Sequence, residues 1–463
     1  MNAKQSAPGR WIRDWDPEDE AFWEREGRYV ARRNLILSVL AEHIGFSVWS
    51  MWSVLVLFMS PDIGFSFTAS EKFLLVVVPT LVGSLLRIPY SAAVGRFGGR
   101  NWTIFASAVL LVPASLTVYF VQRPQTPLWV FLLIGALAGL GGGNFASSMT
   151  NITRFYPRRL QGWALGINAG GGNLGVSVVQ LLGLLVIATV GDQHPSYVAA
   201  VYLPLIVLIS LFAALRMDNL EVSKTEPGAM REVAKHPHTW AIALLYIGTF
   251  GSFIGYGFAF GLVLQTQFGS TPLEAASFTF LGPLLGSLSR PYGGKAADRW
   301  RGPRVVFWAF LAMALGTAVL LLASLNGSFG LFVAAFTLLF VLSGFANGAT
   351  YKMIPGVHGR EAEVAIAGGA DAATAFARAN RLSGALIGLA GAIGGFGGVA
   401  INLAFRTAYG SWGEGTVAFA AFLGYYALCM LLTWAVYLRQ RPGAMHAPIP
   451  PIPVERPRAT SRV

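Results

Sequence analysis

The sequence predicts an all-α membrane protein with twelve transmembrane helices in two pseudo-symmetric six-helix halves. Three observations support this fold class. Of the 463 residues, 54% are hydrophobic and only 12% are charged, whereas a soluble domain carries roughly 25% charged residues. The apolar residues fall into runs of about 20, the length that crosses a hydrocarbon core as a helix. Two sets of motifs also recur 203 residues apart, which indicates an internal duplication.

Twelve apolar runs are separated by polar turns, and each is predicted to be one membrane-spanning helix. The predicted spans are 34–59, 72–96, 102–121, 128–153, 160–190, 197–216, 239–265, 273–297, 304–325, 329–355, 380–406 and 415–438. Residues 356–379 carry three acids and are expected to form a solvated connector.

The polar stretches divide the chain into five parts. Residues 1–33 are charged and lack the apolar region of a signal peptide, so we expect a cytoplasmic segment that includes a short surface helix. Residues 217–238 are charged and contain two prolines, as a linker between halves would. The predicted parts are the N-terminal segment 1–33, the N-terminal half 34–216, the linker 217–238, the C-terminal half 239–438 and a cytoplasmic tail 439–463.

The net charge of +12 could suggest a nucleic-acid partner, but its distribution argues against one. With the N-terminus in the cytoplasm, the outer loops hold only Lys72, Arg123 and Arg406. Almost all other basic residues then lie at the cytoplasmic side, as is typical of the short loops that orient a polytopic protein. We therefore expect a multi-pass plasma-membrane protein, a monomer with both termini in the cytoplasm and no nucleic-acid partner.

The tetrapeptide Gly-Gly-Gly-Asn occurs twice, at 141–144 and 170–173. A phosphate-binding glycine loop would follow a strand and open a helix, and the Walker form needs Gly-Lys-Ser/Thr; neither condition is met. Glycines in membrane helices instead let backbones approach closely. The glycines assigned to helix packing are Gly143, Gly170, Gly171 and Gly172.

Polar residues form a stripe on each of the two helices that carry these glycines. Because residues at i, i+4 and i+7 share one helical face, Asn144 lines up with Ser148 and Asn151, and Asn173 with Ser177 and Gln180. A polar stripe inside a bilayer costs free energy unless it is paired or lines a wet path. Close packing alone does not account for it.

The duplication is marked by two independent pairs of residues. "LLRIPYSAAVGRFGGR" and "SLSRPYGGKAADRWRGPR" each carry Arg, then Pro-Tyr, then a turn rich in Gly and Arg, and Arg87 and Arg290 are 203 residues apart. Asn144 and Asn347 are separated by the same offset. Parallel duplicated halves are the organisation of transporters, whose site lies between the halves near the midplane.

Arg87 and Arg290 are predicted to lie deep in the membrane. They precede the glycines at the next turns, Gly98 and Gly302, by 11 and 12 residues, or roughly 16–18 Å along a helix. A charged side chain at this depth costs about 2.5–3.5 kcal/mol on insertion scales. A fixed carboxylate could offset that cost, but Glu42, expected near the cytoplasmic end of the first helix, cannot neutralise two arginines. A mobile anion is the better partner.

A small monovalent anion suits two arginines better than a multiply charged phosphate. Guanidinium is planar and presents a fork of donors to a planar oxyanion. Asn144 and Asn173 could add neutral donors. Phe145, Tyr246 and Phe250 could wall the site or simply pack in the core.

Two neighbouring titratable residues in the first helix allow two interpretations of their role. Glu42 and His43 could carry a coupled proton, or they could form hydrogen bonds between helices. The one cysteine, Cys429, excludes an internal disulfide, and no pair of histidines has metal-binding spacing. We therefore expect no metal, no cofactor and no enzymatic activity. No soluble signalling domain fits between the helices, which argues against a sensor.

Several motifs together resemble the nitrate/nitrite porter family of the major facilitator superfamily. They are "GGGNFASSMTNI", "GINAGGGNLGVSVVQ", "SLLRIPYS", "LLYIGTFGSFIGY" and "GFANGATYKMIP". The resemblance implies the major facilitator fold and transport of nitrate and nitrite by alternating access, as nitrate/nitrite exchange or, alternatively, as nitrate/proton symport. By resemblance, Arg87 and Arg290 match the pair that clamps the anion. The residues matching positions that line the site are Phe145, Asn173, Tyr246 and Phe250. The first-half turn "AVGRFGGR" departs from the family pattern, since it lacks the acid that Asp298 supplies in the second half.

Overall fold

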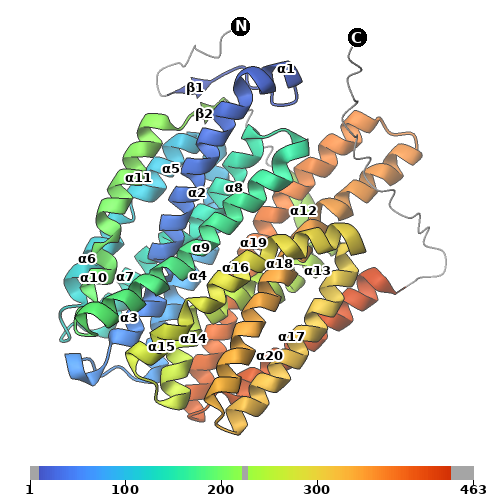
Figure 1. Cartoon of the computed structure of the whole chain (residues 1–463). Helices are drawn as coiled ribbons and strands as arrows, with labels where there is room; N and C mark the ends of the chain where they lie inside the picture. The colour runs from blue at the N-terminus through green and yellow to red at the C-terminus, as the bar shows by residue number, and fades with distance from the viewer. Residues whose placement is uncertain (1–9, 222–227, 440–463) are drawn as a thin grey trace, which may run out of the picture.

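The computed structural model describes residues 10–221 and 228–439, which form a bundle of long helices (Figure 1). The elements up to the linker are β1 Trp11–Ile12, α1 Glu20–Phe22, η1 Trp23–Gly27, α2 Arg28–Ser50, α3 Trp52–Phe58, η2 Pro61–Ile63, α4 Ala69–Phe97, α5 Gly99–Ala108, α6 Leu111–Phe120, α7 Leu128–Ala138, η3 Gly139–Gly143, α8 Asn144–Phe155, α9 Arg158–Val190, α10 Ser196–Ala200 and α11 Tyr202–Arg216. Those that follow are β2 Asn219–Leu220, α12 Gly228–Ala234, α13 Pro237–Tyr246, η4 Ile247–Gly251, α14 Ser252–Phe268, α15 Pro272–Thr279, α16 Leu281–Trp300, α17 Gly302–Leu325, α18 Phe329–Ala367, α19 Ala372–Ser411, α20 Thr416–Thr433 and η5 Trp434–Leu438.

The predicted fold class is confirmed. In the described part of the chain, 11 continuous helices are long and apolar enough to cross a membrane. The remaining predicted span, 273–297, corresponds to α15 and α16. Its composition is less apolar because α16 carries Arg290 and, near its end, Lys295, Asp298 and Arg299.

Two predicted boundaries were wrong. The first span begins earlier than residue 34, because helical residues from Glu20 run into α2 and form no separate surface helix. The segment 356–379 is largely exposed, as a solvated connector would be, but it is mostly helical, since α18 continues to Ala367 and α19 starts at Ala372. Close to these ends, Ile354 of α18 and Leu386 of α19 pack with Val233 of α12 in a small apolar cluster. The predicted tail 439–463 lies almost entirely outside the described residues.

Matching helix boundaries extend the internal repeat. Thr68 and Glu71 form a capping box at the start of α4, and Thr271 and Glu274 form the same box at the start of α15. Each box satisfies backbone N–H groups that a helix start leaves unpaired. Gly98 and Arg301, which end α4 and α16, have φ angles of 86° and 70°. All these pairs are 203 residues apart, so the duplication includes the turns.

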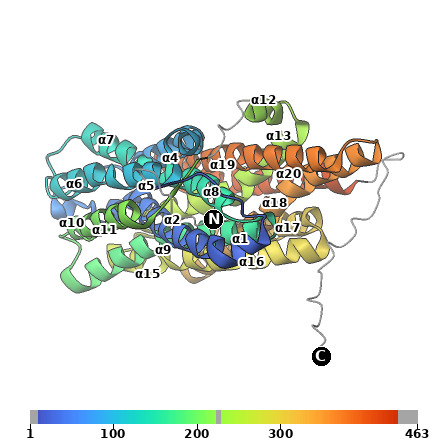
Figure 2. The ribbon, with the colours of Figure 1, turned by 90° about the horizontal axis from the view of Figure 1, so that it is seen from above.

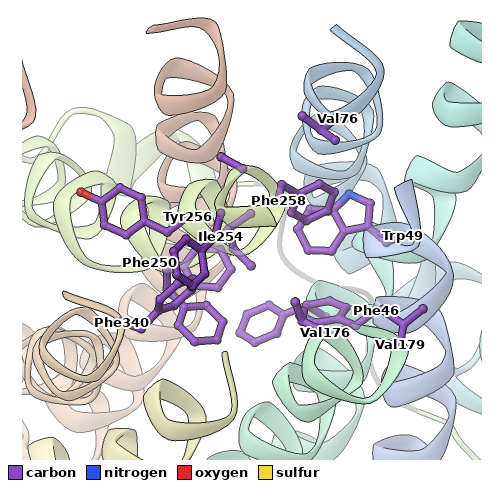
Figure 3. Packing of buried hydrophobic residues seen from close by; sticks show 14 of the residues in the cluster. Phe46, Trp49, Val76, Val176, Val179, Phe250, Ile254, Tyr256, Phe258 and Phe340 are labelled. Carbon is purple, nitrogen blue, oxygen red and sulfur yellow. The ribbon is translucent and has the colours of Figure 1, made fainter. Parts of the chain in front are cut away.

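The two halves lie side by side, with α4 against α19 and α9 against α16 (Figure 2). Aromatic side chains from both halves meet in the middle of the bundle (Figure 3). There the rings of Trp49 in α2 and Phe258 in α14 have centroids 5.2 Å apart. The core is therefore continuous across the boundary between the halves.

The glycine-rich segment Gly139–Gly143 is a short 3-10 helix in close contact with its neighbours. A Cβ on Gly142 would lie 2.8 Å from the Cα of Gly83 in α4. In the other half, a Cβ on Gly344 would lie 2.0 Å from the carbonyl oxygen of Gly286. Only glycine fits so close to another backbone, and each half uses this contact between corresponding helices.

Candidate anion site between the halves

The bundle has two faces, which we name from the linker. The linker face carries the linker residues 217–221 and 228–236 together with the turn between α8 and α9; the far face carries α10 and the start of α15 (Figure 1). At the far face the two halves are in contact. The ring of Phe73 in α4 stacks on Phe405 and Tyr409 of α19 at 5.9 and 5.5 Å.

Hydrogen bonds reinforce this far-face closure. Gln265 donates to the carbonyl oxygen of Leu57 at 3.1 Å, and Arg406 donates to Ser70 Oγ at 3.2 Å. Deeper in the bundle, Gln180 of α9 donates to the carbonyl oxygen of Gly257 in α14 at 2.7 Å.

Toward the linker face the same helices separate. Gly162, Gly166 and Gly170 share the face of α9 that carries Gln180, yet open space surrounds the position of a Cβ at each of them. Gly384 and Gly388 of α19 likewise face open space. Gly391 lies on the same face of α19, one turn further along, and there the helix contacts Arg87. The boundary between the halves is thus closed at the far face, and we call its linker-face part, where these glycines lie in open space, the cleft.

Arg87 lies at the closed end of this cleft. Its guanidinium carbon is 4.9 Å from the ring centroid of Phe145 and 4.6 Å from that of Phe250, so an aromatic ring from each half contacts it. One nitrogen, Nη1, donates to the carbonyl oxygen of Gly391 at 2.8 Å. Nε and Nη2 are buried without a hydrogen-bond partner among the described residues. A buried cationic fork with two unused donors is suited to an oxyanion.

Arg290 supplies the second cation from α16. Its guanidinium carbon lies 5.7 Å from the ring of Tyr351 in α18, and its buried Nη1 has no partner within the described chain. Tyr246 stacks on Phe250 at 5.4 Å. The hydroxyls of Tyr246 and Tyr351 are also buried and unpaired among the described residues, so they can donate to the same ligand.

The two polar stripes face different surroundings. On α9, Asn173 is buried with an unpaired Oδ1, on the stripe that reaches the other half at Gln180. On α8, a Cβ on Gly45 of α2 would touch Asn144, and a Cβ on Gly99 of α5 would touch Asn151. The α8 stripe therefore packs inside the N-terminal half, and Asn144 contacts α2 there.

Glu42 is fully buried and lies deeper than the sequence predicted, because α2 begins at Arg28. Its Oε2 accepts hydrogen bonds from Ser148 of α8 and, at 2.7 Å, from Asn168 of α9. It lies close enough to Arg87 and Arg290 to interact with both of them when it is ionised. His43 lies beside it, and its Nδ1 is 3.0 Å from the carbonyl oxygen of Gly171.

The four assigned glycines differ in their contacts. A Cβ on Gly143 would lie 2.7 Å from Tyr90, one on Gly171 would lie 2.4 Å from Val39, and one on Gly172 would lie 2.1 Å from Glu42 Oε1. Gly170 differs from the prediction, since no atom lies within 4 Å of its Cβ position. It faces the cleft and is no helix contact in this conformation.

Sequence reasoning missed Tyr351 and Asn168. Tyr351 lies four residues after Asn347, one of the marks of the repeat, so the i, i+4 rule could have placed it on the same face. Asn168 lies in "GINAGGGN", just before the Gly-Gly-Gly-Asn motif, and is not part of that motif.

Two repeated six-helix halves with a buried arginine from each at the boundary between them are the organisation of a membrane transporter. The family model of the Major Facilitator Superfamily matches residues 43–379. The chain belongs to this superfamily and, within it, to the nitrate/nitrite porter family that its motifs predicted. It is a transporter and not an enzyme.

Named relatives cover nearly the whole chain. It is 40% identical over 451 residues to the nitrate/nitrite transporter NarU of Salmonella typhimurium, covering 93% of this chain and 97% of that protein. It is 30% identical to a probable nitrate/nitrite antiporter NarK2 of Thermus thermophilus, over 94% of this chain and 98% of that one. Among solved structures, a bacterial homologue of the human lysosomal transporter Spinster, in an inward-facing and occupied conformation, has a TM-score of 0.60 at 15% identity, covering 86% of this chain and 96% of that one. That likeness concerns the fold alone.

Proposed function

We propose that this protein carries nitrate and nitrite across the plasma membrane, with Arg87 and Arg290 clamping the anion between the halves. The observation that carries the proposal is the set of buried, unpaired guanidinium nitrogens on both arginines, which are Nε and Nη2 of Arg87 and Nη1 of Arg290. A planar oxyanion can accept hydrogen bonds from two such guanidinium groups, one on each side. The names of the relatives, nitrate/nitrite transporters and a probable antiporter, support the choice of anion.

When Glu42 is ionised, the charges at the site favour a monovalent substrate. Glu42, Arg87 and Arg290 are buried and interact electrostatically. With the carboxyl ionised, they sum to one positive charge. One nitrate or nitrite neutralises that charge, whereas a divalent anion would leave a buried negative charge, which is costly.

The distribution of basic residues supports a cytoplasmic linker face, so that this conformation is open to the cytoplasm. Closing that face brings Arg87 and Arg290 together, and repulsion disfavours this step when no anion is bound. Bound anion offsets the repulsion and competes with the Gly391 carbonyl for Arg87. On this basis the empty carrier returns slowly, and import of nitrate is coupled to export of nitrite.

Nitrate/proton symport is a second candidate, favoured by the position of Glu42. This buried carboxyl lies near both arginines, and its Oε1 has no partner among the described residues. A proton on Glu42 would raise the charge of the site from +1 to +2 and so alter the balance that the anion must restore. His43, half-buried beside it, is the other group that could take a proton.

Reconstituted vesicles distinguish the two modes. Vesicles are loaded with nitrite or with an inert buffer, and nitrate uptake is followed with and without an imposed pH gradient. Exchange predicts rapid uptake only when nitrite is inside, whatever the gradient. Uptake into nitrite-free vesicles that is driven by the gradient and lost in Glu42→Gln or His43→Gln would overturn obligatory exchange in favour of symport. Failure to take up nitrate in every condition would reject the substrate itself.

A further inference from the structure

Three histidines gather at the linker face of the C-terminal half. His236 lies in the turn between α12 and α13, His238 at the start of α13 and His358 near the end of α18. The ring centroid of His236 is 5.6 Å from that of His238 and 5.6 Å from that of His358. Glu361 bridges two of these rings, because its Oε1 lies 2.7 Å from His236 Nε2 and its Oε2 lies 2.9 Å from His358 Nδ1. None of these residues belongs to the anion site.

The two contacts of Glu361 assign the ring nitrogens that carry hydrogen when the histidines are neutral. An ionised carboxylate only accepts hydrogen bonds, so His236 donates from Nε2 and His358 donates from Nδ1. The other nitrogens, His236 Nδ1 and His358 Nε2, are buried and have no hydrogen-bond partner among the described residues. His358 is only 1% exposed. A proton added to His358 would therefore create a buried N–H group without an acceptor, which is costly.

A second carboxylate nearby is already engaged by arginines. Glu232 of α12 accepts hydrogen bonds at 2.9 Å from Arg378 Nε and at 2.9 Å from Arg381 Nη2, both in α19. This leaves Glu361 as the carboxylate that pairs with the histidines. In the described part of the chain, the charged and titratable groups that face the three rings are Glu232 from α12, Glu361 from α18, Arg378 and Arg381 from α19 and Tyr437 from η5.

These contacts join the linker to two helices that border the cleft. Glu232 holds α12 to the start of α19, and the contact of His236 with Glu361 holds the turn after α12 to the end of α18. Gly384 and Gly388 of α19 lie in the open space of the cleft. Closing the cleft therefore moves this end of α19 toward α9, together with the elements that are attached to it.

We propose that His236, His358 and Glu361 form a pH-sensitive latch, which holds α12 to the end of α18 and opens when the linker face becomes acid. Histidine ordinarily changes its charge between pH 5 and 8. Glu361 can balance one imidazolium. When both rings are charged, one positive charge has no counterion and lies beside the other ring, so His358 leaves its buried position and α12 separates from α18.

The effect of the latch on transport rests on the proposed function. With the latch open, the linker-face ends of α18 and α19 lose their contacts with α12 and must be ordered again before the cleft can close, which costs conformational entropy. Acid at the linker face should therefore slow transport. This regulation differs from proton symport, because the protons that open the latch bind and leave on the same side of the membrane.

Hydrogen exchange of the purified full-length protein tests the latch without any transport. After correction for intrinsic rates, amides of residues 228–236 should exchange about tenfold faster at about pH 5.5 than at about pH 7.5. The double variant His236→Gln/His358→Asn keeps N–H donors close to the positions of Nε2 and Nδ1 but cannot be protonated, so its exchange should not respond to acid. His194→Gln is the matched control, because His194 is exposed at the far face, where its ring stacks on Tyr197, and it should keep the wild-type response.

Nitrate self-exchange measures the consequence for transport. Vesicles loaded with unlabelled nitrate take up labelled nitrate, with the same pH on both sides so that no proton gradient contributes. The same acidification should slow uptake by the wild type about tenfold if about nine-tenths of the latches open, and should leave uptake by the double variant within about twofold. His358→Asn alone should also resist acid, since Glu361 balances the one charge that remains, and it replaces the double variant if that protein does not fold.

The outcomes separate the latch from the proposed function. Acid-accelerated exchange of residues 228–236 that is equal in the wild type and in His358→Asn would overturn the latch. Acid-accelerated exchange in the wild type alone, with nitrate uptake unchanged by acid, would overturn its role in transport. A wild type that takes up no nitrate at either pH would reject the proposed function, and hydrogen exchange would still decide the latch.

Discussion

The far-face closure offers a sharp test of alternating access, because two residues from opposite halves lie within disulfide range. A Cβ on Gly410 of α19 would lie 3.6 Å from the Cβ of Ser70 in α4. Disulfides have Cβ–Cβ distances of about 3.5–4.5 Å. The double variant Ser70→Cys/Gly410→Cys, in a Cys429→Ser background, should therefore cross-link readily on oxidation. Neither position is buried, so both are accessible to the oxidant.

The cross-link should hold the far face closed and stop transport. Each locked molecule is inactive, so cross-linking about nine-tenths of the molecules should lower nitrate uptake into vesicles about tenfold. A reducing agent should restore it. The assay pairs uptake with a gel-based measure of the cross-linked fraction in the same vesicles, and Ser70→Cys alone reports the effect of losing the Arg406–Ser70 hydrogen bond.

A matched disulfide within one half serves as the control. A Cβ on Gly171 of α9 would lie 3.6 Å from the Cβ of Val39 in α2, the same separation as in the test pair. Val39→Cys/Gly171→Cys also removes the valine methyl that would contact the new Cβ. If the halves rock as units, this cross-link should leave transport largely intact. Full cross-linking of Ser70→Cys/Gly410→Cys with undiminished transport would refute the assignment of these residues to a moving gate.

Four further predictions follow from the described contacts. Arg87→Lys and Arg290→Lys should each weaken nitrate binding about tenfold or more, because an ammonium cannot replace the planar fork; binding that matches the exposed control Arg123→Lys would contradict the clamp. Gly171→Leu should lower the free energy of unfolding by about 1–3 kcal/mol, because the new side chain overpacks on Val39. Gly170→Ala places its methyl in open space and should not lower it, so equal melting temperatures of the two variants would refute this prediction. The hydrogen bond from Arg378 lowers the pKa of Glu232, so the stability that this bond contributes is present above the unfolded pKa and lost as pH falls through the folded pKa. Glu232→Gln should therefore lower the free energy of unfolding by under about 1 kcal/mol at neutral pH and not at all in acid, with Glu363→Gln as the exposed control. A difference in melting temperature that persists in acid would contradict this. Glu42→Gln removes the negative charge of the ionised carboxyl, which at about 8 Å and an effective dielectric of about 20 is worth about 2 kcal/mol per unit of anion charge. Binding should therefore shift toward sulfate over nitrate about 30-fold, and unchanged selectivity would show that Glu42 contributes no charge to the site.

The fold and the two arginines could be predicted from sequence because both rest on large free-energy terms. Long apolar runs leave a membrane as the only suitable solvent, and an arginine inside such a run needs a partner. The 203-residue repeat then identified Arg87 and Arg290 as corresponding positions in the two halves. The matching capping boxes at Thr68 and Thr271 could have been found by the same comparison, since both read Thr-x-x-Glu. For Phe145 and Phe250 the residues alone left open whether they wall the site or pack in the core, and the family resemblance favoured the site.

Two features could not be predicted, for identifiable physical reasons. The depth of Glu42 depends on where α2 begins, and the charged residues before it are helical although their composition resembles a surface segment. The direction of Asn144 depends on the 3-10 turn Gly139–Gly143, which precedes α8. A 3-10 turn advances by three residues per turn instead of 3.6, so it changes which face of the following helix meets α2. A helical-wheel argument cannot register that change.

The repeat places one arginine in each half, but it does not repeat the acid. The residue 203 positions after Glu42 is Leu245, and both are buried. A site built symmetrically would carry an even charge, either +2 without acids or zero with two. When it is ionised, the single carboxyl gives an odd charge, which is the condition for neutralising one monovalent anion. Preference for nitrate and nitrite over divalent anions would then come from Glu42, a buried charged position that the second half does not repeat, and the repeated arginines would supply affinity and geometry.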